Sequence, residues 1–103
     1  MEVSADELRQ AVERLHLYRA TFRIAVPVLE RFEGEVAWDG VVHVFDLTEH
    51  PSAKTCFAWS SPIKNSVHRQ FYAVLKVSPI LSASDAVRAA ILKDYRNAQT
   101  TNK

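Results

Sequence analysis

Residues 41–60, VVHVFDLTEHPSAKTCFAWS, decide the fold that the sequence predicts. Two runs rich in β-branched and aromatic residues flank a polar segment in which Pro51 fixes its own φ and biases His50 toward extended backbone. The pattern predicts a central β-hairpin with strands at about 41–47 and 54–60. The same stretch holds two of the four histidines, the only cysteine and one of the two tryptophans, so a functional site is sought here first.

Further strands are expected on both sides of this hairpin. Upstream, Asp39-Gly40 lies between β-favouring runs and predicts a tight turn after a strand at about 35–38. Downstream, RQFYAVLKV predicts a strand at about 69–77 that ends at Ser78-Pro79. The four runs together predict an antiparallel β-meander.

The N-terminal third predicts a long helix over about 5–33, because Ser4 and Glu7 form an S-x-x-E capping box and Gly34 suits a helix C-terminus. Apolar residues recur along it at spacings of three, four and seven: Leu8, Val12, Leu15, Phe22, Val26 and Leu29. An unbroken helix of about 28 residues spans roughly 42 Å, more than the roughly 34 Å diameter of a compact domain this size. Pro27 therefore leaves a kink, a break, or an overhang covered by a second subunit as alternatives.

A second helix is expected to close the chain. Ser82, followed three residues later by Asp85, predicts its start, and the helix is expected over about 83–97. The tail, residues 100–103, is expected to be disordered. The sequence thus predicts one α+β domain over residues 1–103, with both helices packed on one face of a four-stranded antiparallel meander.

Composition narrows the function classes. The 103 residues are 48% hydrophobic and 24% charged, as in an ordinary globular domain, and the net charge of +1 favours neither nucleic acid nor an anionic membrane. A single cysteine, Cys56, fits a reducing compartment. The acidic start, MEVSADE, and the absence of an apolar run near the ~20 residues that span a bilayer point to the cytoplasm. With only Gly34 and Gly40 there is no glycine-rich phosphate loop, and no cofactor is expected.

Strand alternation sorts the central side chains into two faces. We expect the pairs Phe45 with Phe57, His43 with Trp59 and Asp46 with Cys56, which place the odd-numbered residues against the helices. The even-numbered face is mixed in polarity and is expected to form a homodimer interface or the wall of a small-molecule pocket. Its binding candidates are Val42, Val44, Asp46, Ala58, Tyr72 and Val74.

The catalytic candidates are His50, Cys56, His68 and Tyr72. One arrangement activates Cys56 by His68, oriented by Asp46, and another uses His68, Arg69, Tyr72 and His50 as in small toxin ribonucleases. One observation speaks against each arrangement. Strand cysteines usually pack as small hydrophobic residues, and a net charge near zero disfavours binding of a polyanion such as RNA.

A metal site and an aromatic ligand site are two further hypotheses. His43, His50, Cys56 and His68 are metal-ligand types, but their spacing matches no structural site, so no metal is expected. Trp59 is expected in the core, whereas Trp38 is open between core packing and ligand stacking.

Three segments carry a family resemblance: VFDLTEHPSAKTCFAWS at 44–60, RQFYAVLKVSPI at 69–80 and SDAVRAAI at 84–91. Over roughly residues 36–97 the chain resembles small uncharacterised proteins of bacterial integron gene cassettes and environmental genomes, most distinctively in the H-P-x-A-x-x-C-[FY]-A-W-S run. The resemblance implies a cytoplasmic bacterial protein from a mobile element, a compact α+β fold and oligomerisation. It implies no activity and no catalytic residue.

The expected function is a non-enzymatic binding or protein-interaction module that acts as a homodimer, with a small molecule as a further candidate ligand. The alternative is a small hydrolase or toxin-like ribonuclease that uses the histidine, tyrosine, arginine or cysteine side chains above. The alternative requires those side chains to converge on one concave site.

Overall fold

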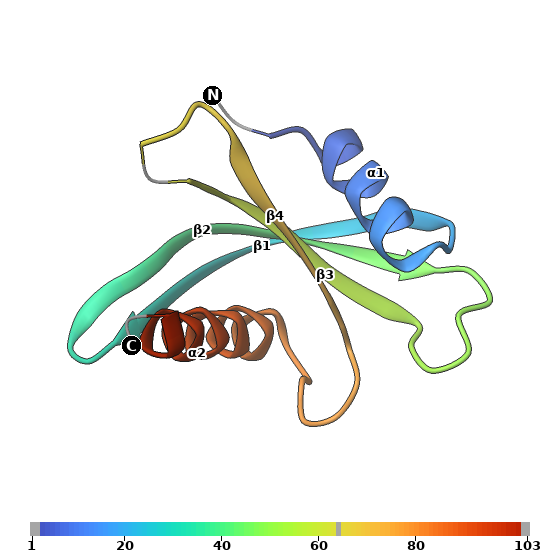
Figure 1. Ribbon diagram of the computed structural model, residues 1–103. Coiled ribbons are helices and arrows are strands. Elements are labelled where there is room, and N and C mark those ends of the chain that lie inside the picture. Colours follow the sequence, from blue (N-terminus) through green and yellow to red (C-terminus); the bar gives the residue numbers. More distant parts are fainter. Residues whose placement is uncertain (1–2, 64, 102–103) are drawn as a thin grey trace.

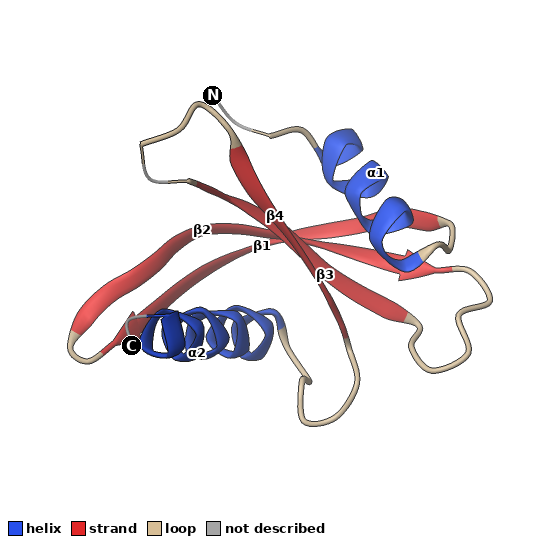
Figure 2. Ribbon diagram, in the orientation of Figure 1, coloured by secondary structure: helices blue, strands red, loops and turns tan. Residues whose placement is uncertain are grey.

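The computed structural model describes residues 3–63 and 65–101. Its elements, in chain order, are α1 (Ala5–His16), β1 (Ala20–Phe32), β2 (Glu35–Leu47), β3 (Thr55–Pro62), β4 (Arg69–Leu75) and α2 (Ala83–Thr101). The strands of the described chain form one antiparallel sheet in the order β1-β2-β3-β4 (Figures 1 and 2). The expected α+β class, with a four-stranded antiparallel meander and an N-terminal and a C-terminal helix that pack against it, is confirmed.

The first helix is much shorter than predicted. Its capping box is present, since the Ser4 hydroxyl accepts the Glu7 N–H at 3.1 Å and the Glu7 carboxylate accepts the Ser4 N–H at 3.4 Å. Leu17 then adopts the left-handed conformation, with φ of 64°, and donates its N–H to the Glu13 carbonyl. This cap ends α1 at His16, so the prediction of a helix over 5–33 is wrong for its second half.

Residues 20–32 form an edge strand instead. Thr21, Ile24, Val26 and Val28 are β-branched, and this preference outweighs the helical spacing of the apolar residues. Pro27 lacks a backbone donor, which an edge strand tolerates and a helix interior does not. None of the three alternatives drawn from Pro27 therefore applies.

The tight turn lies at Glu33-Gly34 and not at Asp39-Gly40. Glu33 and Gly34 have φ of 54° and 84°, the two positive values that a two-residue type I′ hairpin requires. β2 runs without interruption through Gly40, so the strands predicted at 35–38 and 41–47 are one strand. A tight turn that contains glycine was predicted correctly, but it lies at Gly34 and not at Gly40.

Both helices pack against the sheet, but on its two opposite faces and not on one (Figure 1). Under α1, Leu8 and Val12 share a core with Phe45, Leu47, Cys56 and Ala58. Under α2, Ala83, Ala86 and Val87 share a second core with Val42, Val44, Phe57 and Trp59. Each face thus needs its own helix, because both faces of the sheet centre are apolar.

The register between β2 and β3 differs from the predicted one by one residue. Phe45 lies opposite Cys56, Val44 opposite Phe57 and His43 opposite Ala58. A shift of one residue moves every β3 side chain to the other face of the sheet. Cys56 and Ala58 consequently lie under α1, while Phe57 and Trp59 lie under α2.

The second helix begins where predicted and runs further. The Ser82 hydroxyl accepts the Asp85 N–H at 3.1 Å, which confirms the predicted cap. α2 continues to Thr101, so the predicted disordered tail is wrong for residues 100–101, and residues 102–103 lie outside the described residues. Buried Glu30 of β1 pairs with Arg88 of α2 at 2.8 Å, which ties this helix to the edge strand.

Candidate functional site

The sheet divides into two hairpins that diverge from each other. β1 and β2 pair along almost their whole length, and so do β3 and β4. β2 and β3, in contrast, pair only from His43 opposite Ala58 to Asp46 opposite Thr55 (Figure 1). From His43 toward the Glu33-Gly34 turn, β2 therefore separates from β3.

Trp38 bridges this separation. Its indole Nε1–H donates to the Ser61 hydroxyl at 3.0 Å, and its ring centroid lies 6.0 Å from that of Trp59. The indole also lies directly over Gly40, where an added Cβ would come within 2.7 Å of the Trp38 ring. Gly40 thus serves a close approach within a strand and not a turn. Of the two roles left open for Trp38, the structure shows packing against the α2 core.

A cleft of about 1020 Å³ lies at the divergence. Asp39, Val41 and His43 of β2 form one wall, and Ser60 and Arg69 form the opposite wall. The N-terminal end of α1, with Val3 and Leu8, and the Trp38 indole complete the lining. The volume falls at the upper end of the range of small-molecule sites.

Arg69 is the cationic side chain of this lining. Its Nε donates to the Ser60 hydroxyl at 2.8 Å and its Nη2 to the Ser60 carbonyl at 3.3 Å. Among the described residues no carboxylate lies within 4.0 Å of its guanidinium. The neutral oxygens of Ser60 therefore hold the Arg69 guanidinium in place, and no carboxylate of the described residues forms an ion pair with it.

His43 lies on the β2 wall and packs its ring 5.5 Å from that of Phe22. Burial lowers the pKa of the His43 imidazole, which favours the neutral ring. Its Nδ1 is buried and, within the described part of the chain, has no hydrogen-bond partner. Buried polar atoms in native proteins nearly always have a partner, so this orphan atom marks the wall of the cleft as unusual.

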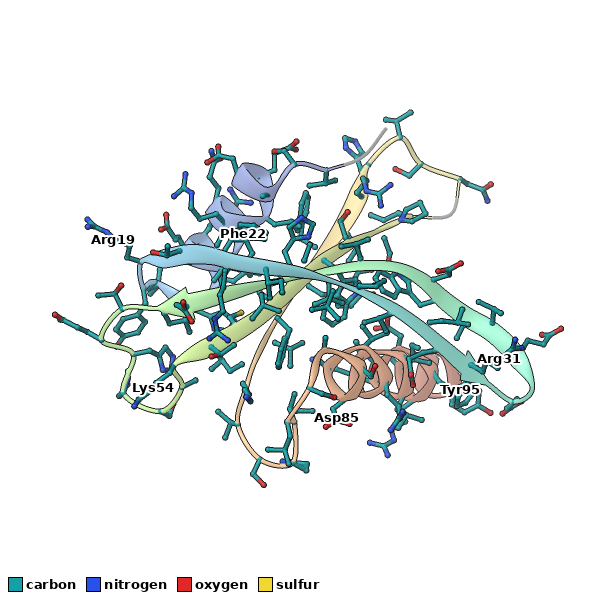
Figure 3. All side chains as sticks on the ribbon, turned by 180° about the vertical axis from the view of Figure 1, so that it is seen from behind. Arg19, Phe22, Arg31, Lys54, Asp85 and Tyr95 are labelled. Atoms are coloured by element: carbon teal, nitrogen blue, oxygen red, sulfur yellow. The ribbon has the colours of Figure 1, made fainter. Side chains whose placement is uncertain are left out.

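The β1–β2 hairpin exposes an apolar surface beside the cleft. We call it the hairpin patch, and its residues are Phe22, Ala25, Pro27, Leu29 and Val41. Phe22, Leu29 and Val41 are 43%, 51% and 46% exposed. Figure 3 shows Phe22 next to α1, at the opposite end of the hairpin from Arg31 and Tyr95. On the other face of the same strands Val28 and Val42 are buried under α2, whereas Leu29 and Val41 of the patch are not covered by the described chain.

The structure does not bring the four catalytic candidates together. His50 stabilises the β2–β3 turn, where its Nδ1 accepts the backbone N–H groups of Ser52 and Ala53, both at 3.1 Å. Cys56 is fully buried under α1, and this burial raises the pKa of its thiol to about 12. A thiol in that state is a packing group and not a nucleophile.

His68 and Tyr72 lie elsewhere. His68 is exposed in the β3–β4 loop. Tyr72 lies on the α2 face, stacked on Trp59 with ring centroids 5.0 Å apart, and its hydroxyl donates to Asp94 at 2.6 Å. Burial, with the Asp94 carboxylate as a second cause, raises the pKa of the Tyr72 phenol. The Cys56 arrangement does not form, because Cys56 is buried under α1 while His68 is exposed in the β3–β4 loop. The ribonuclease arrangement does not form either, because His50 lies in the β2–β3 turn and Tyr72 packs against the α2 core.

The expected binding face is also divided. Val42 and Val44 are buried under α2, where Tyr72 and Val74 pack against them, and Ala58 is buried under α1. Asp46 is exposed and forms an ion pair with Arg23. Val42, Val44 and Ala58 thus belong to the two cores of the chain and offer no surface to a partner.

Sequence reasoning named His43 and Trp38 of the cleft lining, for a metal site and for ligand stacking, but it missed the cleft itself and the hairpin patch. Arg69 appeared only in the ribonuclease hypothesis, and Leu29 was assigned to a helix stripe. One feature of the sequence could have indicated the patch: residues 24–29 are apolar at every position. A strand that exposes one face to water needs apolar residues only at alternate positions. Among the described residues no three His, Cys, Asp or Glu side chains gather in a way that could hold a metal ion.

No helix within the described ranges is both long enough and apolar enough to cross a bilayer. No protein family model matches the chain, and comparison with curated proteins and with solved structures finds no similar protein.

Proposed function

We propose that the protein is a non-enzymatic interaction module that forms a homodimer through the hairpin patch. The observation that carries the proposal is the contrast between the two faces of one hairpin. α2 buries Val28 and Val42, while Leu29 and Val41 on the reverse face are about half exposed. Exposed apolar side chains that lie together on one surface usually mark a site of interaction with a partner.

A second copy of the chain is the occupant that suits the patch. The five patch side chains carry no charge, so two patches in contact desolvate no ion pair, and a two-fold axis makes one such surface complementary to itself. The net charge of +1 adds almost no repulsion between copies. Pro27 removes a backbone donor from the edge strand β1, which favours contact through the face of the hairpin over edge-to-edge strand pairing.

The hydrolase or ribonuclease alternative has no comparable support, because His50, Cys56, His68 and Tyr72 occupy separate places in the fold. The free thiol of Cys56 suits the reducing cytoplasm, where we place the protein. The resemblance to integron cassette proteins is compatible with this proposal and supplies no activity of its own.

Sedimentation equilibrium tests the dimer. We expect a mass of twice the 11.7 kDa of one chain. Burying the exposed half of Leu29 contributes about 1 kcal/mol in each copy, so Leu29→Glu should weaken the dimer by at least roughly 30-fold.

Val67→Glu is the matched control for this variant, because Val67 is 95% exposed in the β3–β4 loop and lies outside the patch. It should leave the dimer unchanged. A parent chain that is monomeric at millimolar concentration, or a Leu29→Glu variant that associates as tightly as the control, would contradict the proposal.

A further inference from the structure

Arg69 differs from the paired arginines of this protein in its partners. Arg9, Arg23 and Arg88 each contact a carboxylate. Arg69 is partly buried and, among the described residues, hydrogen-bonds only to the hydroxyl and carbonyl oxygens of Ser60. These bonds orient the planar guanidinium and leave Nη1 without a hydrogen bond to any described residue. An oriented and unbalanced guanidinium is the group that proteins use to recognise carboxylates in a bidentate manner.

The surroundings of Arg69 define what else a ligand must carry. Val3, Leu8, Val36 and Val41 give the cleft apolar walls, and burial lowers the pKa of the His43 imidazole, which favours the uncharged ring. We propose that the cleft between α1 and the two diverging hairpins binds a small monocarboxylic acid, with the carboxylate on Arg69 and an apolar body against β2 and α1. This site adjoins the homodimer surface at Val41, but Arg69, which carries the proposal, lies outside the hairpin patch.

The charges of the lining favour a single negative charge. Arg69 is its one permanent cation among the described residues, and Asp39 on the β2 wall repels additional anionic groups. A phosphate dianion or a nucleic acid backbone needs several cations or a glycine-rich loop, and the described residues that line the cleft supply neither. A carboxylate balances Arg69 with one bidentate contact.

The test is a titration of the ¹⁵N-labelled protein with benzoate, benzamide and inorganic phosphate, followed by ¹H–¹⁵N NMR. Benzoate should shift the signals of the Trp38 indole, Ser60, Ser61 and Arg69, whereas benzamide and phosphate should not. Arg69→Gln should weaken benzoate binding roughly tenfold or more, and Arg69→Lys should weaken it less. Arg14→Gln, which alters an exposed arginine of α1 outside the cleft, should leave binding unchanged.

Several outcomes would overturn the proposal. They are the absence of shifts at these residues up to tens of millimolar benzoate, equal shifts with benzamide, a response to phosphate alone, or unchanged binding by the arginine variants. If Arg69→Gln does not fold, Arg69→Lys and Ser60→Ala decide, since each disturbs the oriented fork while the charge is retained. The dimer variant Leu29→Glu should bind benzoate as the parent does, which separates this result from that of the homodimer.

Discussion

Gly40→Ala tests the reading that β2 contains glycine because the Trp38 indole lies on it. A Cβ at position 40 would lie 2.7 Å from Cζ2 and 2.8 Å from Cη2 of Trp38, closer than real contacts allow. The indole is rigid and donates a hydrogen bond to the Ser61 hydroxyl, so the clash can be relieved only if the ring or the strand shifts. Overpacking of this kind costs about 1–3 kcal/mol, and the loss of unfolded-chain freedom offsets about 0.4–1 kcal/mol of it.

We therefore expect a net destabilisation of about 1–2 kcal/mol, which lowers Tm by about 5–10 °C in a domain of this size. Urea unfolding followed by far-UV circular dichroism measures the free energy without relying on Trp38 fluorescence. Trp38→Phe removes the two clashing ring atoms, so Gly40→Ala should cost clearly less in that background.

A Gly40→Ala variant as stable as the parent would refute the reasoning. An equal cost in the Trp38→Phe background would also refute it, because the clash would then not involve the indole. Gly34 gives a contrast: nothing lies within 4 Å of a Cβ there, but its φ of 84° makes any substitution strain the backbone. The Gly34→Ala cost should be the same with Trp38 or with Phe at position 38.

Two further predictions concern side chains in the core and the cleft. Cys56, whose pKa burial raises to about 12, should resist iodoacetamide at pH 8 in the folded protein and react fully in urea; rapid labelling of the native chain would show that the thiol is accessible. His43 has a pKa lowered by burial, so below the ordinary value of about 6.5 the unfolded chain binds more protons than the folded one. The contribution of His43 to the free energy of unfolding should therefore be complete above that pH and decrease as the pH falls through it. Urea titrations at pH 7.5 and 5.5 measure this decrease, and His43→Gln should make it smaller. An equal decrease in the variant would assign the loss of stability to other groups.

Signals that act over a few residues were readable from the sequence. The Ser4–Glu7 capping box and the Ser82–Asp85 cap predicted both helix starts, because each bond closes within three residues. The β2–β3 turn at His50 was predicted for the same reason, since Pro51 restricts the backbone locally. The C-terminal end of α1 and the identity of β1 were not predicted, because Leu17 in a left-handed cap and a proline on a sheet edge become favourable only in the folded context.

The register between β2 and β3 could not be predicted from the sequence. β3 is apolar on both faces, with Cys56 and Ala58 on one and Phe57 and Trp59 on the other, so either register buries hydrophobic side chains. The alternation of side chains along a strand is a local property. Which set of side chains faces α1 and which faces α2 depends on how the helices pack against the sheet.

By itself the sequence determined the α+β class, the segments that form β2, β3 and β4, and the places where the helices begin. Only the tertiary structure decided that α1 and α2 cover opposite faces, and that residues 41–60 are divided between two cores instead of forming one site. It also decided that Arg69 and His43 line one cleft. The physical reason is that residues far apart in the chain meet only when β2 and β3 pair over a short stretch and then diverge.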